Sequence, residues 1–133
     1  MRYIAVFESV SGIVPRDCVE VEEADKITFV VKEEELGGAI GKNGCNIKRI
    51  RQKLGKNVDV VVYSDDPSQF IKNILNPADI QDVKIVEKGD SKVALIDVEY
   101  TEKGRAIGRG GWNIKRARKL ALRHHDIDDV SVI

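Results

Sequence analysis

One twenty-residue pattern occurs twice in this sequence. Residues 35–54 read ELGGAIGKNGCNIKRIRQKL, residues 102–121 read EKGRAIGRGGWNIKRARKLA, and the segments agree at eleven of twenty aligned positions at a constant offset of 67. A constant offset indicates an internal duplication. Two units of this length lie near the lower size limit for an independent core, so we expect domains at residues 1–65 and 66–133 that depend on each other for stability.

The second unit is predicted to contain a helix, a hairpin, two further helices and a final strand. Asp66 suits the N-cap and Pro67 the first position of a helix over 67–75. Residues 80–100 hold two runs rich in β-branched side chains around Gly89 and Asp90, which is typical of two strands and a turn. Residues 102–107 favour a short helix, GRGG interrupts it, residues 112–125 resume a helix, and residues 129–133 favour a strand.

The first unit repeats this order in a shorter form. Strands are expected in CVEVEE and ITFVVK, helices in ELGGAI and NIKRIRQKL on either side of the turn GKNG, and a last strand in VDVVVY. Only the beginning is ambiguous. Tyr3, Ile4 and Phe7 suit a short helix within RYIAVFES, but IAVF could equally form a strand.

Charge is distributed unevenly along the chain, although the formal net charge is zero. Residues 37–57 and 103–125 together carry 14 cations and no acid, whereas the remaining residues hold 8 cations and 22 acids. The duplicated segments are therefore the basic part of an otherwise acidic protein, and a basic patch is what a polyanionic partner requires. A helix with a solvated basic face is the simpler alternative.

Each copy places two glycines around two small or basic residues, immediately before a helix. Glycine lets the backbone turn sharply and lets another backbone approach closely, because it has no Cβ. The first amides of a helix lack intrahelical partners, and the helix dipole is positive at that end, so the turn suits an anion such as phosphate. Lys42 and Arg109 occupy the same place in the two turns. Neither GKNG nor GRGG has the spacing of a P-loop or of a dinucleotide-binding motif.

With two short helices around each GxxG turn, the segments resemble the K-homology (KH) domain, whose GxxG loop clamps the backbone of about four nucleotides. The chain ends about eight residues after the last helix, so the extra helix and strand precede the GxxG turn, as in type II KH domains. The resemblance implies an α+β fold of two tandem type II KH domains, each a three-stranded sheet packed against helices. It also implies a set of RNA-binding residues: Gly41, Lys42, Asn43, Gly44, Lys48, Arg49, Arg51, Gly108, Arg109, Gly110, Gly111, Trp112, Lys115, Arg116 and Arg118.

Tandem type II KH domains with almost no linker resemble the short archaeal form of the NusA family of transcription elongation, termination and antitermination factors. This resemblance implies a non-enzymatic, cytoplasmic protein that binds single-stranded RNA and needs no cofactor, small-molecule substrate or membrane. Contact with RNA polymerase or the transcription complex remains open, because the sequence has no room for the polymerase-binding and S1 domains of the bacterial form. A ribosome-associated or RNA-processing KH protein is one alternative, and a protein-interaction module without RNA binding is another.

Several further residues leave two interpretations open. Trp112 could stack a base or pack against the neighbouring unit. Isoleucines around the turns, among them Ile40 and Ile107, could line a hydrophobic floor for bases or belong to the core. Neither a disulfide nor a zinc site is indicated by the two cysteines, Cys18 and Cys45. The adjacent histidines 124 and 125 point in different directions on a helix and are read as helix-end cations or surface residues.

Overall fold

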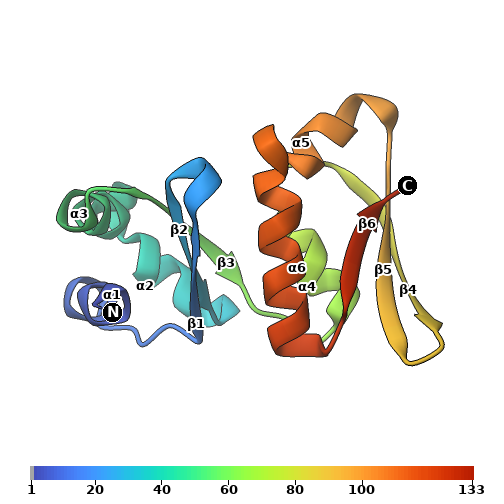
Figure 1. Ribbon diagram of the computed structural model, residues 1–133. Helices are drawn as coiled ribbons and strands as arrows, with labels where there is room; N and C mark the ends of the chain where they lie inside the picture. Colours follow the sequence, from blue (N-terminus) through green and yellow to red (C-terminus); the bar gives the residue numbers. More distant parts are fainter. Residues whose placement is uncertain (1) are drawn as a thin grey trace. The chain divides into compact units, whose positions relative to one another are not determined.

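The computed structural model describes residues 2–133. Within them the chain forms two compact units, one ending at Tyr63 (unit 1) and one running from Ser64 to Ile133 (unit 2). Each unit repeats the order helix, strand, strand, helix, helix, strand. In each, the helices lie on one face of a three-stranded sheet (Figure 1). The α+β architecture predicted from the sequence is confirmed.

Unit 1 begins with a helix, which resolves the ambiguity of its first residues. Its elements are α1 (Tyr3–Ser11), β1 (Asp17–Val21), β2 (Lys26–Val31), α2 (Leu36–Ile40), α3 (Cys45–Leu54) and β3 (Asn57–Val62). Helix α1 ends where Gly12 adopts a left-handed conformation with φ 76° and its N–H donates to the carbonyl of Glu8. The helix buries Phe7, whose ring centroid lies 4.3 Å from that of Phe29 in β2.

Unit 2 follows the predicted boundaries closely. Its elements are α4 (Pro67–Leu75), β4 (Ile80–Lys88), β5 (Ser91–Val98), α5 (Lys103–Ile107), α6 (Trp112–His125) and β6 (Asp129–Val132). The carboxylate of Asp66 accepts a hydrogen bond from the N–H of Ser68, as expected for the N-cap of α4. Strands β4 and β5 form the predicted antiparallel hairpin.

Both sheets have the same topology. The middle strand, β2 or β5, pairs antiparallel with the strand before it and parallel with the last strand of the unit. The last strand, β3 or β6, is therefore an edge strand, and alternate backbone groups along it face away from the sheet. This open edge lies beside the helix that follows the GxxG turn.

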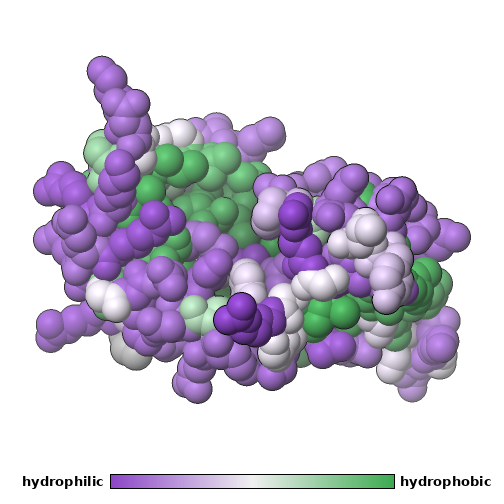
Figure 2. Space-filling model, turned by 90° about the horizontal axis from the view of Figure 1, so that it is seen from above, coloured by the Kyte–Doolittle hydropathy of each residue, from purple (hydrophilic) through white to green (hydrophobic). Residues whose placement is uncertain are grey.

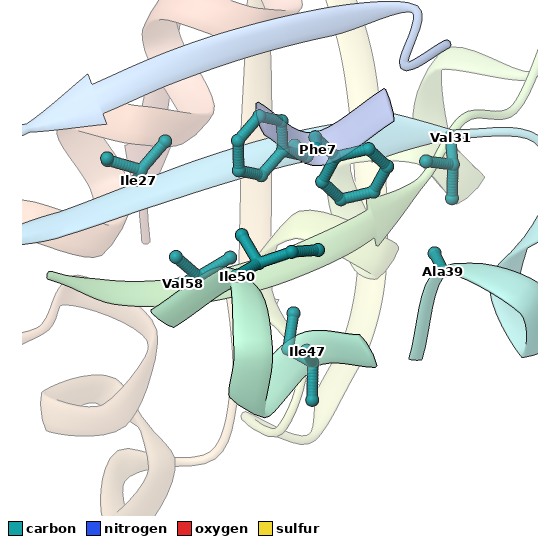
Figure 3. Close-up of a cluster of buried hydrophobic side chains, with 8 residues drawn as sticks. Phe7, Ile27, Val31, Ala39, Ile47, Ile50 and Val58 are labelled. Carbon is teal, nitrogen blue, oxygen red and sulfur yellow. The ribbon is translucent and has the colours of Figure 1, made fainter. Parts of the chain in front are cut away.

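The core of unit 1 lies between its helices and the inner face of its sheet (Figure 3). Its buried members are Phe7, Ile27, Phe29, Val31, Ala39, Ile47, Ile50 and Val58. In unit 2 the buried face of α6 holds Ile114, Ala117, Leu120 and Ala121, which is the face that the helical spacing predicts. Most isoleucines around the turns thus serve the core, and only some reach the surface.

Candidate nucleic-acid interface

The two GxxG turns have nearly the same backbone. Their first glycines, Gly41 and Gly108, have φ/ψ of 78°/168° and 79°/160°. Their last glycines, Gly44 and Gly111, have φ of 74° and 77°, and the N–H of each donates to the carbonyl of the first glycine. The duplicated sequence therefore builds the same turn twice, each directly before the longer helix α3 or α6.

The first position of each turn requires glycine, because the start of the following helix comes very close to its Cα. A Cβ on Gly41 would lie 2.8 Å from the backbone nitrogen of Asn46, and one on Gly108 would lie 2.7 Å from Nε1 of Trp112. The following helix thus begins in contact with the turn. The third position of each turn has a left-handed backbone conformation, with φ of 56° at Asn43 and 66° at Gly110. Asparagine and glycine both adopt that conformation readily.

An asparagine repeated in both copies ties the two helices of each motif together. Nδ2 of Asn46 donates to the carbonyl of Gly38 at 2.8 Å, and Nδ2 of Asn113 donates to the carbonyl of Arg105 at 3.4 Å. Each bond joins the helix after the turn to the helix before it. Neither asparagine was predicted as a functional residue from the sequence, although their identity at the offset of 67 was a visible signal.

Equivalent grooves run beside the two turns. Groove 1 has a volume of about 270 Å³ and is lined by Ile40, Ile47, Arg51, Asp59 and Val60. Groove 2 also has a volume of about 270 Å³ and is lined by Ile107, Ile114, Arg118, Ser131 and Val132. Ile40 and Ile107 are each 37% exposed, whereas Ile50 and Ala117 are buried. The apolar floor considered from sequence is thus a small one, made of two isoleucines in each unit.

Arg51 and Arg118 join the helix to the edge strand at equivalent points. Arg51 donates from Nε and Nη2 to the carbonyl of Val58, and Nε of Arg118 donates to the carbonyl of Val130 and to Oδ1 of Asp129. Both arginines line their grooves while holding one outward-facing carbonyl of the strand. Both guanidinium groups are thus held at a fixed place, and that of Arg118 forms an ion pair with Asp129.

The cations on and after the turns are mostly exposed. Lys42 and Arg109 on the turns are exposed, as are Lys48 and Lys115 one turn into the helices and Arg49 beside Lys48. Lys56 differs, because its Nζ lies 2.9 Å from Oε2 of Glu20 and 3.3 Å from Oδ1 of Asp25.

The hydrogen bond from Lys56 to Glu20, and a second one to Asp25, raise the pKa of the Lys56 ammonium above its ordinary value. The positive charge of Lys56 thus has two acidic neighbours within unit 1.

Arg116 corrects the expectation of an exposed positive field along the whole of α6. It is 2% exposed, and its Nη2 donates to the carbonyl of Ile74 at 2.7 Å and to Oδ1 of Asn113 at 2.8 Å. Its guanidinium carbon lies 4.8 Å from the centroid of the half-buried Trp112 ring. The prediction that Arg116 is a surface cation is wrong, because α4 packs against α6 and offers the guanidinium a buried carbonyl acceptor. Trp112 packs within its own unit, over Gly108 and Arg116.

The adjacent histidines are less exposed than expected for surface residues. Both are half-buried against Phe70, with ring centroids 5.6 Å (His124) and 5.5 Å (His125) away, and Nε2 of His125 lies 2.9 Å from the carbonyl oxygen of Ser64.

The surface in view in Figure 2 is mainly hydrophilic, with hydrophobic residues confined to patches. Among residues 2–133, none of the helices has the length and apolar character needed to span a bilayer.

Comparison with known proteins matches each unit to a model of a KH domain. Residues 1–65 match the model of the KH domain, and residues 67–132 match that of the NusA-like second KH domain. The chain is 38% identical over 130 residues to the probable transcription termination protein NusA of Methanocaldococcus jannaschii, covering 98% of this chain and 70% of the relative. It is 38% identical to the protein of that name in Halococcus morrhuae, covering 99% and 93%.

Among solved structures, the crystal structure of APE1850 superposes with a TM-score of 0.84 at 39% identity, covering 99% of this chain and 96% of that one. The similarity in sequence and the similarity in structure therefore extend over nearly the whole chain. The chain belongs to the NusA-like family and consists of two tandem KH domains.

Proposed function

We propose that this protein binds single-stranded RNA by its sugar-phosphate backbone, with one contact site at each GxxG turn. The observation that carries the proposal is the repetition of a single arrangement: a glycine turn with an exposed cation, the N-terminus of a helix, and an adjacent groove with an apolar floor. In this proposal, the exposed cations Lys42 and Arg109 meet a phosphate that the glycines admit.

The groove supplies the second half of the proposed contact. An unpaired base has an apolar face and a polar edge, so it suits a groove with an isoleucine floor on one side and an open strand edge on the other. Ile40 and Ile107 provide the partly exposed floor, and β3 and β6 provide the edge. A duplex would present its bases already paired, which is why we propose single strands.

The setting of this binding is proposed from the relatives. Those in Methanocaldococcus jannaschii and Halococcus morrhuae are named probable transcription termination proteins. We therefore propose a role in transcription elongation, termination or antitermination, exerted by binding the RNA without catalysis.

Acidic substitutions in the turns test RNA binding directly. Lys42→Asp with Asn43→Asp in the first turn, and Arg109→Asp with Gly110→Asp in the second, should each weaken binding of a mixed-sequence single-stranded RNA, and the combination should weaken it most. Positions 43 and 110 both have a left-handed conformation, which aspartate adopts at a smaller cost than most residues, and a Cβ on Gly110 would meet no atom within 4 Å, so the fold should survive. Thermal unfolding of each variant checks this.

A matched control separates the turns from net charge. Lys84→Glu with Ser91→Glu makes the same change in net charge on exposed positions of the β4–β5 hairpin, and it should leave affinity nearly unchanged at moderate salt. Unchanged affinity in the combined turn variant would refute the proposal.

The transcription role needs a separate measurement. Tagged protein from its native cells should co-purify with RNA polymerase in a nuclease-sensitive manner. Recovery of ribosomal subunits instead would favour the ribosome-associated alternative.

A further inference from the structure

We propose a base-stacking site on Tyr100 that extends the RNA path of groove 2 along helix α5. The inference rests on the proposed RNA binding and adds one specific contact to unit 2. Tyr100 is 87% exposed, and it is the most exposed of the large hydrophobic side chains in residues 2–133. Its ligand would be one unpaired base of the strand held in groove 2.

Tyr100 is aligned with groove 2 through a helical row of side chains. Residues 100–102 form a single 3₁₀ turn that leads directly into α5, so Tyr100, Lys103 and Ile107 follow one another at spacings of three and four. The Nζ of Lys103 lies 5.9 Å from the centroid of the Tyr100 ring, which places these two side chains together. Ile107, at the other end of the row, lines groove 2.

The row of Tyr100, Lys103 and Ile107 has the length and the chemistry to contact a short stretch of RNA beyond groove 2. Seven residues of helix span about 10 Å, which suits one or two nucleotides beyond the groove. A tyrosine ring stacks any base by its π-face, and a neighbouring lysine can meet the phosphate that accompanies that base. An exposed aromatic ring beside a cation, in line with a groove, is the arrangement that single-stranded nucleic acid requires.

The acidic groups nearby are engaged elsewhere. Oε1 of Glu102 accepts a hydrogen bond from the N–H of Asp79 at 2.9 Å and lies 3.7 Å from Nη1 of Arg105. Oε1 of Glu99 accepts from Nε2 of Gln81 at 3.1 Å. These carboxylates bind groups outside the row of Tyr100, Lys103 and Ile107.

The equivalent row in unit 1 lacks both features. At the offset of 67, Tyr100 corresponds to Glu33, Lys103 to Leu36 and Ile107 to Ile40. Leu36 packs against the core, and Glu33 begins an acidic turn of three glutamates that would repel a phosphate. The extension therefore belongs to unit 2 alone, and it makes the two KH domains unequal.

The test uses the full chain carrying Lys42→Asp and Asn43→Asp, so that binding reports mainly on unit 2. Affinity is measured for mixed-sequence single-stranded RNAs of about four and about eight nucleotides. Tyr100→Ala should weaken binding of the longer RNA by about tenfold and leave the shorter one nearly unchanged. Tyr100→Trp should keep the full affinity. Tyr100→Leu retains apolar area without a π-face and should behave like Tyr100→Ala, whereas Val14→Ala, at an exposed position of unit 1, should change nothing.

Salt dependence separates the two side chains of the row. Lys103→Gln should flatten the slope of log affinity against log salt by about 0.7, while Tyr100→Ala should leave the slope intact. Unchanged affinity of Tyr100→Ala for the longer RNA, or full affinity of Tyr100→Leu, overturns the stacking site while RNA binding by the turns stands. Failure of the unsubstituted chain to bind either RNA overturns the proposed function and this inference with it.

Discussion

The guanidinium of Arg116 lies 4.8 Å from the centroid of the Trp112 ring, and the two side chains pack together beneath the second GxxG turn. Arg49, which occupies the position of Arg116 in the first copy, is exposed. The same residue in the same repeated motif thus supports the fold in one unit and lies at the surface in the other.

Replacing these two arginines should therefore affect stability very differently. Arg116→Met leaves the carbonyl of Ile74 and Oδ1 of Asn113 without their buried donor, so we expect the free energy of unfolding to fall by roughly 2–3 kcal/mol. Arg49→Met should change it by less than about 0.5 kcal/mol. Urea denaturation measures both variants, and equal losses would contradict the assignment.

This contrast marks the limit of what the sequence could reveal. Periodicity and turn residues predicted the helices and strands of both units, because those signals are local, except that residues 3–11 were left open between a helix and a strand. The exposure of an arginine in NIKR is set by its surroundings: α4 packs on α6 and presents the carbonyl of Ile74 to Arg116. Nothing within the repeated motif records that difference.

The candidate site was likewise predictable only in part from the sequence. The glycine turns and the exposed Lys42 and Arg109 followed from the motif, because their placement depends on local backbone. The grooves did not, since each forms only when the edge strand comes to lie beside the helix after the turn. Asn46 and Asn113 could have been found, because they are identical in both copies and lie two residues after the last glycine of each turn.

Two glycines of unit 1, Gly41 in the first turn and Gly37 in the helix before it, allow a matched test of the close approach. Gly41→Ala places a Cβ 2.8 Å from the backbone nitrogen of Asn46 at a φ of 78°, so the start of α3 must shift, and both stability and RNA affinity should fall. Gly37 lies in helix α2, and a Cβ added there would meet no atom within 4 Å. Gly37→Ala should therefore leave the stability of the protein unchanged or raise it by up to about 1 kcal/mol. Thermal unfolding and RNA titration of both variants measure the effect, and a Gly41→Ala protein that binds normally would contradict it.

Lys56 should contribute to the fold of unit 1 and little to RNA binding. The hydrogen bond to Glu20, and then that to Asp25, raise the pKa of its ammonium. The contribution is therefore complete at neutral pH, below the ordinary lysine pKa of about 10.4, and is lost only as the pH rises through the raised value. Lys56→Gln should lower stability slightly at low salt, less at high salt, and should leave the salt slope of RNA binding unchanged. A flattened slope would show that Lys56 contacts phosphate.

Joining two KH domains in one chain should increase affinity through effective concentration. Separate fragments 1–65 and 66–133 should each bind a long single-stranded RNA more weakly than the intact chain, because the second contact of the intact chain is intramolecular. We also expect the fragments to be less stable than the whole protein, given their size. Titration and thermal unfolding of both fragments measure this, and fragments that match the intact chain in both respects would show that the units act independently.

The salt dependence of RNA affinity tests the central claim most directly. If both turns hold phosphates, log affinity for a single-stranded RNA of about eight nucleotides should fall linearly with log salt, by about 0.7 for each phosphate contacted. Lys42→Ala and Arg109→Ala should each flatten that slope by about the same amount, and Arg49→Met should flatten it where Arg116→Met does not. An affinity that is independent of salt in the unsubstituted protein, or a slope that neither turn substitution alters, would contradict backbone binding at the GxxG turns.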